Sequence, residues 1–240
     1  MSRPDEPRSL SELLASAGRK PTLILLWAPL VLTTWRYYGT KAFYLANLSG
    51  SLVVRGDSSL TAELYAFGSS FLLLGLVSLL VIRVALGESL LEYGLAPGDW
   101  RFGIKAMAIL APVMVLLAYP SARQAPFLAE YPLNPGACAS VTAFLGHAAG
   151  YLLYYVGFEI FFRGLVQNGL RDSLGDWAAI LVQTGLSTLV HIGKPAGEIY
   201  GAILGGVVFG LVALRSRSVL YVILIHWTLG VALDLFICLG

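Results

Sequence analysis

Four polar residues in the apolar second half of the chain are of the types that activate water. Glu159 and Arg163 are four residues apart, so they share one face of a helix. An ionisable side chain at bilayer depth costs about 2.5–3.5 kcal/mol and usually marks a functional site. His191 and His226 follow in later apolar segments. A carboxylate beside two imidazoles can take a proton from water and stabilise the resulting oxyanion.

The same residue types allow other interpretations. Two histidines and a glutamate can hold Zn²⁺ with one open coordination position, but no HExxH spacing fixes Glu159, His191 and His226 as ligands. The Glu159–Arg163 pair could also be an ion pair that only joins helices. The sequence therefore leaves two states of the site open, with no cofactor or with Zn²⁺, and leaves a purely structural role open as well.

The composition predicts an all-α, polytopic membrane bundle. Hydrophobic residues make up 57% of the 240 residues and charged residues only 12%, which excludes a soluble enzyme. The formal charge of +2 is too small to indicate nucleic-acid binding. Cys138 and Cys238 lie far apart in apolar segments without CxxC spacing, and we expect both to be core residues.

Seven apolar segments are long enough to cross a bilayer. The apolar segments predict a cytoplasmic N-terminal segment (1–20) and N-terminal transmembrane helices with an interfacial segment (21–136). The remaining helices (137–240) carry the candidate residues named above and are expected to form the catalytic core. The seven segments cover residues 21–38, 61–87, 103–119, 137–170, 176–192, 196–214 and 219–239.

The basic residues predict the orientation. With the N-terminus inside, ten basic residues are cytoplasmic and five are outside, as the positive-inside rule requires. We therefore expect a multi-pass protein of the bacterial inner (cytoplasmic) membrane. The cytoplasmic set is Arg3, Arg8, Arg19, Lys20, Arg83, Arg101, Lys105, Arg171, Arg215 and Arg217, and the outer set is Arg36, Lys41, Arg55, Arg123 and Lys194.

Depth along the helices predicts which polar residues meet. At about 1.5 Å per residue from the cytoplasmic ends, Glu159 lies about 18 Å deep, Arg163 and His226 about 12 Å, and His191 and Asp234 about 24 Å. A carboxylate, a guanidinium and two imidazoles from three helices could thus line one cavity. Equal depth predicts that Asp234 orients His191 through a carboxylate–imidazole hydrogen bond.

Two further polar residues are placed outside this site. His147 lies roughly 18 Å from Glu159 along the same helix, which excludes it from the predicted cavity. Glu198 follows Lys194 and Pro195, and we expect it to stabilise a helix N-terminus rather than take part in chemistry.

Four motifs together resemble those of the CAAX-protease and bacteriocin-processing (CPBP) family of intramembrane endopeptidases. They are LEYGLAPGDWR, FEIFFRG, LVHIGKPAGE and SVLYVILIHWTLGVALD. The resemblance implies a helical intramembrane protease of glutamate or metal-dependent type. By position, Glu159 and Arg163 match the second glutamate and the arginine of the usual EExxxR, and His191 and His226 match the two histidines.

Two residues depart from that family's pattern. Phe158 stands where the first glutamate is usual, and Gly230 where an asparagine is usual. Either Glu159 acts as the base or the site is inactive. We therefore expect an endopeptidase that cleaves a membrane-associated protein or peptide, the alternative being an inactive membrane binding protein. Replacing Glu159 by glutamine or His226 by alanine is expected to abolish cleavage without changing the protein level.

Overall fold

The computed structural model describes residues 9, 11, 12, 16, 18–51, 53, 54 and 56–240. Regular secondary structure in this part of the chain is entirely helical, which confirms the predicted all-α bundle. Most of the expected N-terminal segment, including Arg3 and Arg8, and also Arg55, lies outside the described residues.

Helices occur at all seven predicted segments. The long ones are α2 (Arg19–Tyr38), Ser58–Leu86, α6 (Trp100–Ser121), Val141–Leu174, α10 (Asp176–Val190), α11 (Ala196–Ser216) and α12 (Leu220–Cys238). Ser58–Leu86 comprises α4 (Ser58–Ser69), η1 (Ser70–Leu76), α5 (Val77–Leu80) and η2 (Val81–Leu86), and Val141–Leu174 comprises α8 (Val141–Glu159), η5 (Ile160–Asn168) and α9 (Gly169–Leu174). The short helices are α3 (Lys41–Asn47), η3 (Leu90–Tyr93), α7 (Ala125–Glu130) and η4 (Pro135–Ala139).

Five helices in the described part of the chain are long and apolar enough to cross a membrane, so the chain is an integral membrane protein. The predicted number of seven is not confirmed, because α2 and α10 are not among the five. With 15 residues, α10 is only about 22 Å long, whereas a hydrocarbon core is about 30 Å thick.

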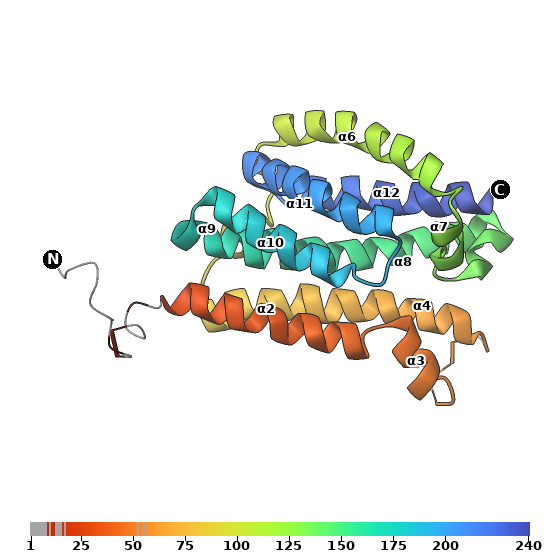
Figure 1. Cartoon of the computed structure of the whole chain (residues 1–240), viewed down its shortest axis with the longest axis horizontal. Helices are drawn as coiled ribbons and strands as arrows, with labels where there is room; N and C mark the ends of the chain where they lie inside the picture. Colours follow the sequence, from red (N-terminus) through yellow and green to blue (C-terminus); the bar gives the residue numbers. More distant parts are fainter. Residues whose placement is uncertain (1–8, 10, 13–15, 17, 52, 55) are drawn as a thin grey trace.

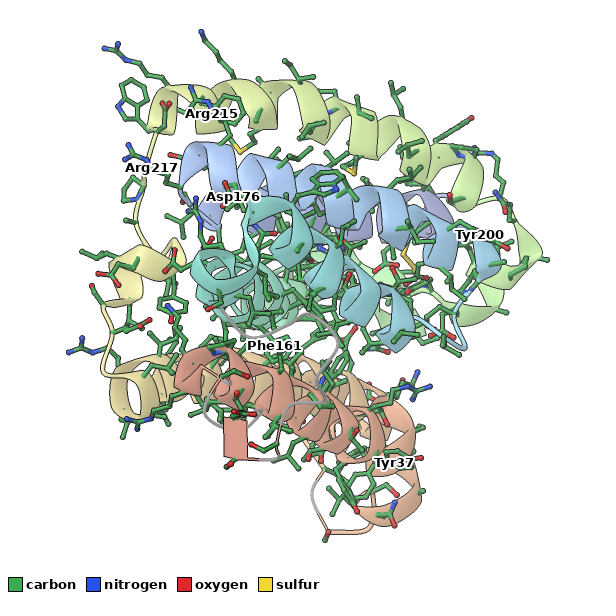
Figure 2. The ribbon with its side chains drawn as sticks, turned by 60° about the vertical axis from the view of Figure 1, so that its left-hand side comes forward. Tyr37, Phe161, Asp176, Tyr200, Arg215 and Arg217 are labelled. Atoms are coloured by element: carbon green, nitrogen blue, oxygen red, sulfur yellow. A yellow bond between two sulfur atoms is a disulfide. The ribbon has the colours of Figure 1, made fainter. Side chains whose placement is uncertain are left out.

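The long helices lie side by side in layers (Figure 1). α2 and α4 form one outer layer, α6 forms the other, and α8, α10, α11 and α12 lie between them. Phe161 is fully buried and lies between α2 and the central helices (Figure 2). The candidate polar residues therefore sit on the central helices, surrounded by apolar side chains.

Close backbone contact holds α8 against the Ser58–Leu86 helix. A Cβ at Gly157 would lie 2.4 Å from the carbonyl oxygen of Ser70, and one at Gly75 would lie 3.1 Å from the Cα of Gly157. Only glycine at 157 permits this approach, as small residues do at membrane helix contacts. The contact fixes the position of the next residues, Phe158 and Glu159, along the bundle axis.

A π-helical segment, η5, begins directly after Glu159. All nine of its residues are buried, Arg163 and Gln167 among them. The side-chain amide of Gln167 donates to the carbonyl oxygen of Gly210 at 3.0 Å, which joins this segment to α11. π-Helical turns are often found at functional sites, and here one begins between Glu159 and Arg163 and contains Arg163.

The two cysteines form a disulfide, so the expectation that they are merely core residues is wrong. Their Cα atoms are 5.0 Å apart. Cys138 lies in η4 just before α8, and Cys238 ends α12. These two ends meet at the same end of the bundle (Figure 1), although 100 residues separate them. Spacing in the sequence cannot show a contact made by antiparallel packing.

Candidate functional site

Glu159, Arg163 and His226 meet in the interior of the bundle. The Glu159 side chain is completely buried. Its Oε1 atom lies 2.6 Å from His226 Nδ1 and accepts a hydrogen bond from Arg163 Nη1 at 3.1 Å. A carboxylate cannot donate, so Nδ1 of His226 carries the hydrogen and, in the neutral ring, Nε2 is left as an acceptor. The His226 side chain is 16% exposed, so this pair joins a buried charge to a partly accessible base.

His191 and His226 both lie beside the ring of Phe158. The ring centroid of Phe158 is 6.0 Å from that of His191 and 5.6 Å from that of His226. His191 is in the turn after α10. In Figure 1 this turn does not extend as far to the right as the ends of α8 and α12 do. The predicted meeting of both histidines with Glu159 is therefore only partly correct: His226 contacts Glu159, whereas the described residues show no hydrogen bond or ion pair between His191 and Glu159.

Asp234 does not orient His191, contrary to the prediction. Its Oδ2 atom lies 2.8 Å from Nε2 of His147, and Nδ1 of His147 lies 2.6 Å from Oε1 of Glu63. Equal depth along two helices fixes height but not the direction in which a side chain points. Asp234 therefore belongs, with Glu63 and His147, to a second buried cluster that the sequence did not predict.

Glu198 is the partner of His191 that sequence reasoning missed. It lies in the first turn of α11, as predicted. Its Oε1 atom is also 3.9 Å from Nε2 of His191, and both its oxygens lie 2.9 Å from the Tyr131 hydroxyl. The available signal was the short HIGKPAGE segment, whose turn brings residues seven positions apart close together.

One comparison with known proteins identifies the region that contains these residues. Residues 140–232 match the family model described as type II CAAX prenyl endopeptidase, Rce1-like. This match confirms the resemblance to CAAX proteases for residues 140–232. No curated protein and no solved structure matches the chain. The Rce1-like segment runs from the start of α8 into α12 and contains Glu159, His191, Glu198 and His226. Because the matched family model is one of endopeptidases, the match indicates a protease, and therefore a hydrolase.

Within the Rce1-like segment, the side chain of Tyr155 occupies the space next to Gly230, which has no side chain of its own. A Cβ at this position would lie 2.1 Å from the hydroxyl oxygen of Tyr155. The Tyr155 ring centroid is 4.5 Å from that of His226. The Tyr155 hydroxyl thus fills the space in which an asparagine side chain at 230 would begin, and it places a polar group near His226.

The donor atoms do not fit the zinc site considered from the sequence. Nε2 of His191 lies 3.9 Å from Oε1 of Glu198, whereas Oε1 of Glu159 contacts Arg163 and His226. Among the residues that the structure describes, no three His, Cys, Asp or Glu side chains are grouped as metal ligands.

Proposed function

We propose that this protein is an intramembrane endopeptidase in which the Glu159–His226 pair activates water. One observation carries the proposal: a fully buried carboxylate lies 2.6 Å from Nδ1 of a histidine that is itself partly exposed. The carboxylate fixes the tautomer of His226, leaves Nε2 free to accept a proton, and stabilises the imidazolium that then forms. Glu159 therefore supports the base rather than acting as the base.

The reaction follows from these positions. Nε2 of His226 takes a proton from water while the water oxygen attacks the carbonyl carbon of the scissile peptide bond. The Tyr155 hydroxyl, which lies over Gly230 beside His226, donates a hydrogen bond to the oxyanion in place of the missing asparagine. The leaving nitrogen then takes up a proton and the C–N bond breaks, which gives a carboxylic acid and an amine that ionise in water to a carboxylate and an ammonium group. Arg163 compensates the charge of Glu159 throughout.

The proposed substrate is a membrane-associated protein or peptide that reaches the site from the lipid bilayer. The family description names CAAX prenyl endopeptidases, so the first probe is an internally quenched peptide ending in a farnesylated CAAX sequence. The second is a quenched transmembrane peptide without a prenyl group, which stands for an envelope protein. Both are incubated with the purified protein in lipid vesicles, with and without a chelator.

We expect cleavage of at least one probe and a fall in rate of about 100-fold or more in His226→Ala, since general-base catalysis contributes about 10²–10⁴-fold. Tyr155→Phe is expected to lower the rate by about 10²-fold or more, the effect of losing one oxyanion donor. Thr228→Val is the matched control, because Thr228 lies on α12 like His226 and its hydroxyl donates to the carbonyl oxygen of Leu224 in the same helix. A normal rate in His226→Ala would contradict the proposal.

One observation favours a second candidate function, a catalytically inactive membrane binding protein. Phe158 is 2% exposed and its ring centroid lies within 6.0 Å of the centroids of both imidazoles, at the position where the resemblance places a catalytic glutamate. In that case the wild-type protein cleaves neither probe. It would instead retain a prenylated peptide in vesicles without shortening it, which mass spectrometry of the recovered peptide would detect.

We further propose the predicted orientation, with the N-terminus in the cytoplasm of a bacterium. Two features support it. The disulfide lies at the end of the bundle opposite the start of α2, where Arg19 and Lys20 lie. Arg215 and Arg217 lie near the start of α10 at Asp176 (Figure 2). Disulfides persist in oxidising compartments such as the periplasm, and basic residues collect on the cytoplasmic side.

In intact spheroplasts we expect a membrane-impermeant maleimide to label the protein only after treatment with a membrane-impermeant reductant. The chain has two cysteines, so the double variant Cys138→Ser/Cys238→Ser is an unlabelled control. Labelling that requires permeabilised membranes would reverse the orientation. Labelling without reductant would show that the cysteines are not paired.

A further inference from the structure

We propose that Glu198 and His191 share one proton and that this pair protonates the leaving amine of the cleaved peptide. The proposal rests on the proposed function, because it supplies the acid that complements the His226 base. Glu198 acts through His191 and is a positioning residue, whereas His191 delivers the proton. No family pattern quoted above assigns a role to Glu198.

The hydrogen bonding of His191 carries the argument. Nδ1 of His191 lies 2.6 Å from the carbonyl oxygen of Ser187, so Nδ1 carries a hydrogen, since a carbonyl can only accept. Nε2 therefore has a free lone pair in the neutral ring. It faces Oε1 of Glu198 at 3.9 Å. Two acceptors that face each other repel, and a proton placed on either one turns the contact into an attraction.

The neighbours hold Glu198 in place without removing it from water. Tyr131 is itself buried and its hydroxyl lies 2.9 Å from both oxygens of Glu198. The side chains of His191 and Glu198 are 16% and 21% exposed, in contrast to the completely buried Glu159. A proton can therefore be exchanged with solvent at this pair.

The charges around the pair also set its proton affinity. Lys194 pairs with Glu130 and lies over the Tyr131 ring at 4.9 Å. The groups that act electrostatically on His191 are His226, Lys194 and Arg163, and those that act on Glu198 are Lys194, Glu130 and Asp234. Burial and the three basic groups named for His191 lower the pKa of His191, so the shared proton of the resting pair lies on Glu198, and the contact between the two side chains lets His191 take it up.

The two histidines, both beside the Phe158 ring, then have complementary roles. His226, held by Glu159, begins unprotonated and takes a proton from the attacking water. The His191–Glu198 pair begins with its proton on Glu198, and His191 takes up that proton and gives it to the amine nitrogen as the C–N bond breaks. Solvent afterwards returns a proton from His226 to the His191–Glu198 pair, so no proton is gained or lost in the cycle. Acid and base in opposite starting states give a bell-shaped pH profile.

The test is the pH profile of kcat for the farnesylated quenched peptide, measured in vesicles between about pH 5 and 9. Glu198→Gln is expected to lower kcat about tenfold or more and to move the alkaline limb to lower pH, because the pair loses the carboxylate that holds the shared proton and His191 alone binds it less tightly. Glu198→Asp is expected to restore part of the rate. Glu92→Gln, an exposed residue of η3, is the control and should leave both unchanged.

A second measurement does not depend on cleavage. Histidine ring nitrogens labelled with ¹⁵N report protonation by NMR in nanodiscs, and the His191 signals are assigned with His191→Asn. We expect His191 to lose its proton at lower pH in Glu198→Gln than in the wild type. Identical titration, or a normal pH profile of kcat in Glu198→Gln, would overturn this inference. If His226→Ala still abolishes cleavage, the proposed function stands without it. If the wild type cleaves neither probe, the proposed function fails and the acid role fails with it.

Discussion

Glu159→Gln is expected to abolish cleavage and also to destabilise the protein. Glutamine can no longer compensate Arg163, which is 2% exposed, and breaking a buried ion pair by removing one partner costs about 3–5 kcal/mol. His226 also loses the carboxylate at Nδ1, so the rate should fall by about 10²–10⁴-fold. The expectation of an unchanged protein level therefore suits His226→Ala but not Glu159→Gln.

The two effects of Glu159→Gln can be separated with a double variant. Glu159→Gln/Arg163→Gln removes both charges, so it should regain much of the thermal stability that the single variant loses, while remaining inactive. Thermal unfolding in nanodiscs and cleavage of the quenched peptides measure the two effects on the same samples. Cleavage at the wild-type rate by either variant would refute the role of Glu159. Equal instability of the single and double variants would refute the role of the ion pair.

The parts of the site that the sequence predicted are those fixed by local geometry. Glu159 and Arg163 are neighbours because a helical turn brings residues four apart together, and that holds even where the π-helical segment begins. The depth of His226 was predicted well enough for its contact with Glu159. The seven helical segments follow from long apolar runs, which also predicted their bounds closely.

The parts that the sequence did not predict depend on how helices are rotated and on what fills the space between them. Rotation decides that Asp234 faces His147 rather than His191. A short α10 and the turn after it bring Glu198 to His191. The position of the Phe158 ring beside both imidazoles and the pairing of Cys138 with Cys238 both arise from packing. None of these contacts has a periodic or local signal.

His147→Leu is expected to destabilise the protein strongly, by about 3–5 kcal/mol or more. The carboxylates of Glu63 and Asp234 lie 2.6 Å and 2.8 Å from the two ring nitrogens of His147, and all three side chains are no more than 1% exposed. Contact with a carboxylate on each side favours a hydrogen on each nitrogen, and thus a cationic ring. Leucine would leave two carboxylates buried without a cation, which is the costly way to break a buried charge cluster.

The cluster joins α4, α8 and α12, near the disulfide that also connects the start of α8 to the end of α12. We therefore expect it to hold helices together and not to take part in cleavage, since His147 lies about 18 Å from Glu159 along α8.

The triple variant Glu63→Gln/His147→Gln/Asp234→Asn replaces the charges by neutral side chains of similar shape. It should recover most of the stability that His147→Leu loses, because removing all charges of a buried cluster together is far less costly than removing one. Thermal unfolding in nanodiscs measures this recovery, and kcat per folded molecule should equal that of the wild type. A folded triple variant with a much lower kcat would instead place the cluster in the catalytic cycle, and stable His147→Leu protein would show that the carboxylates are not charged in the folded state.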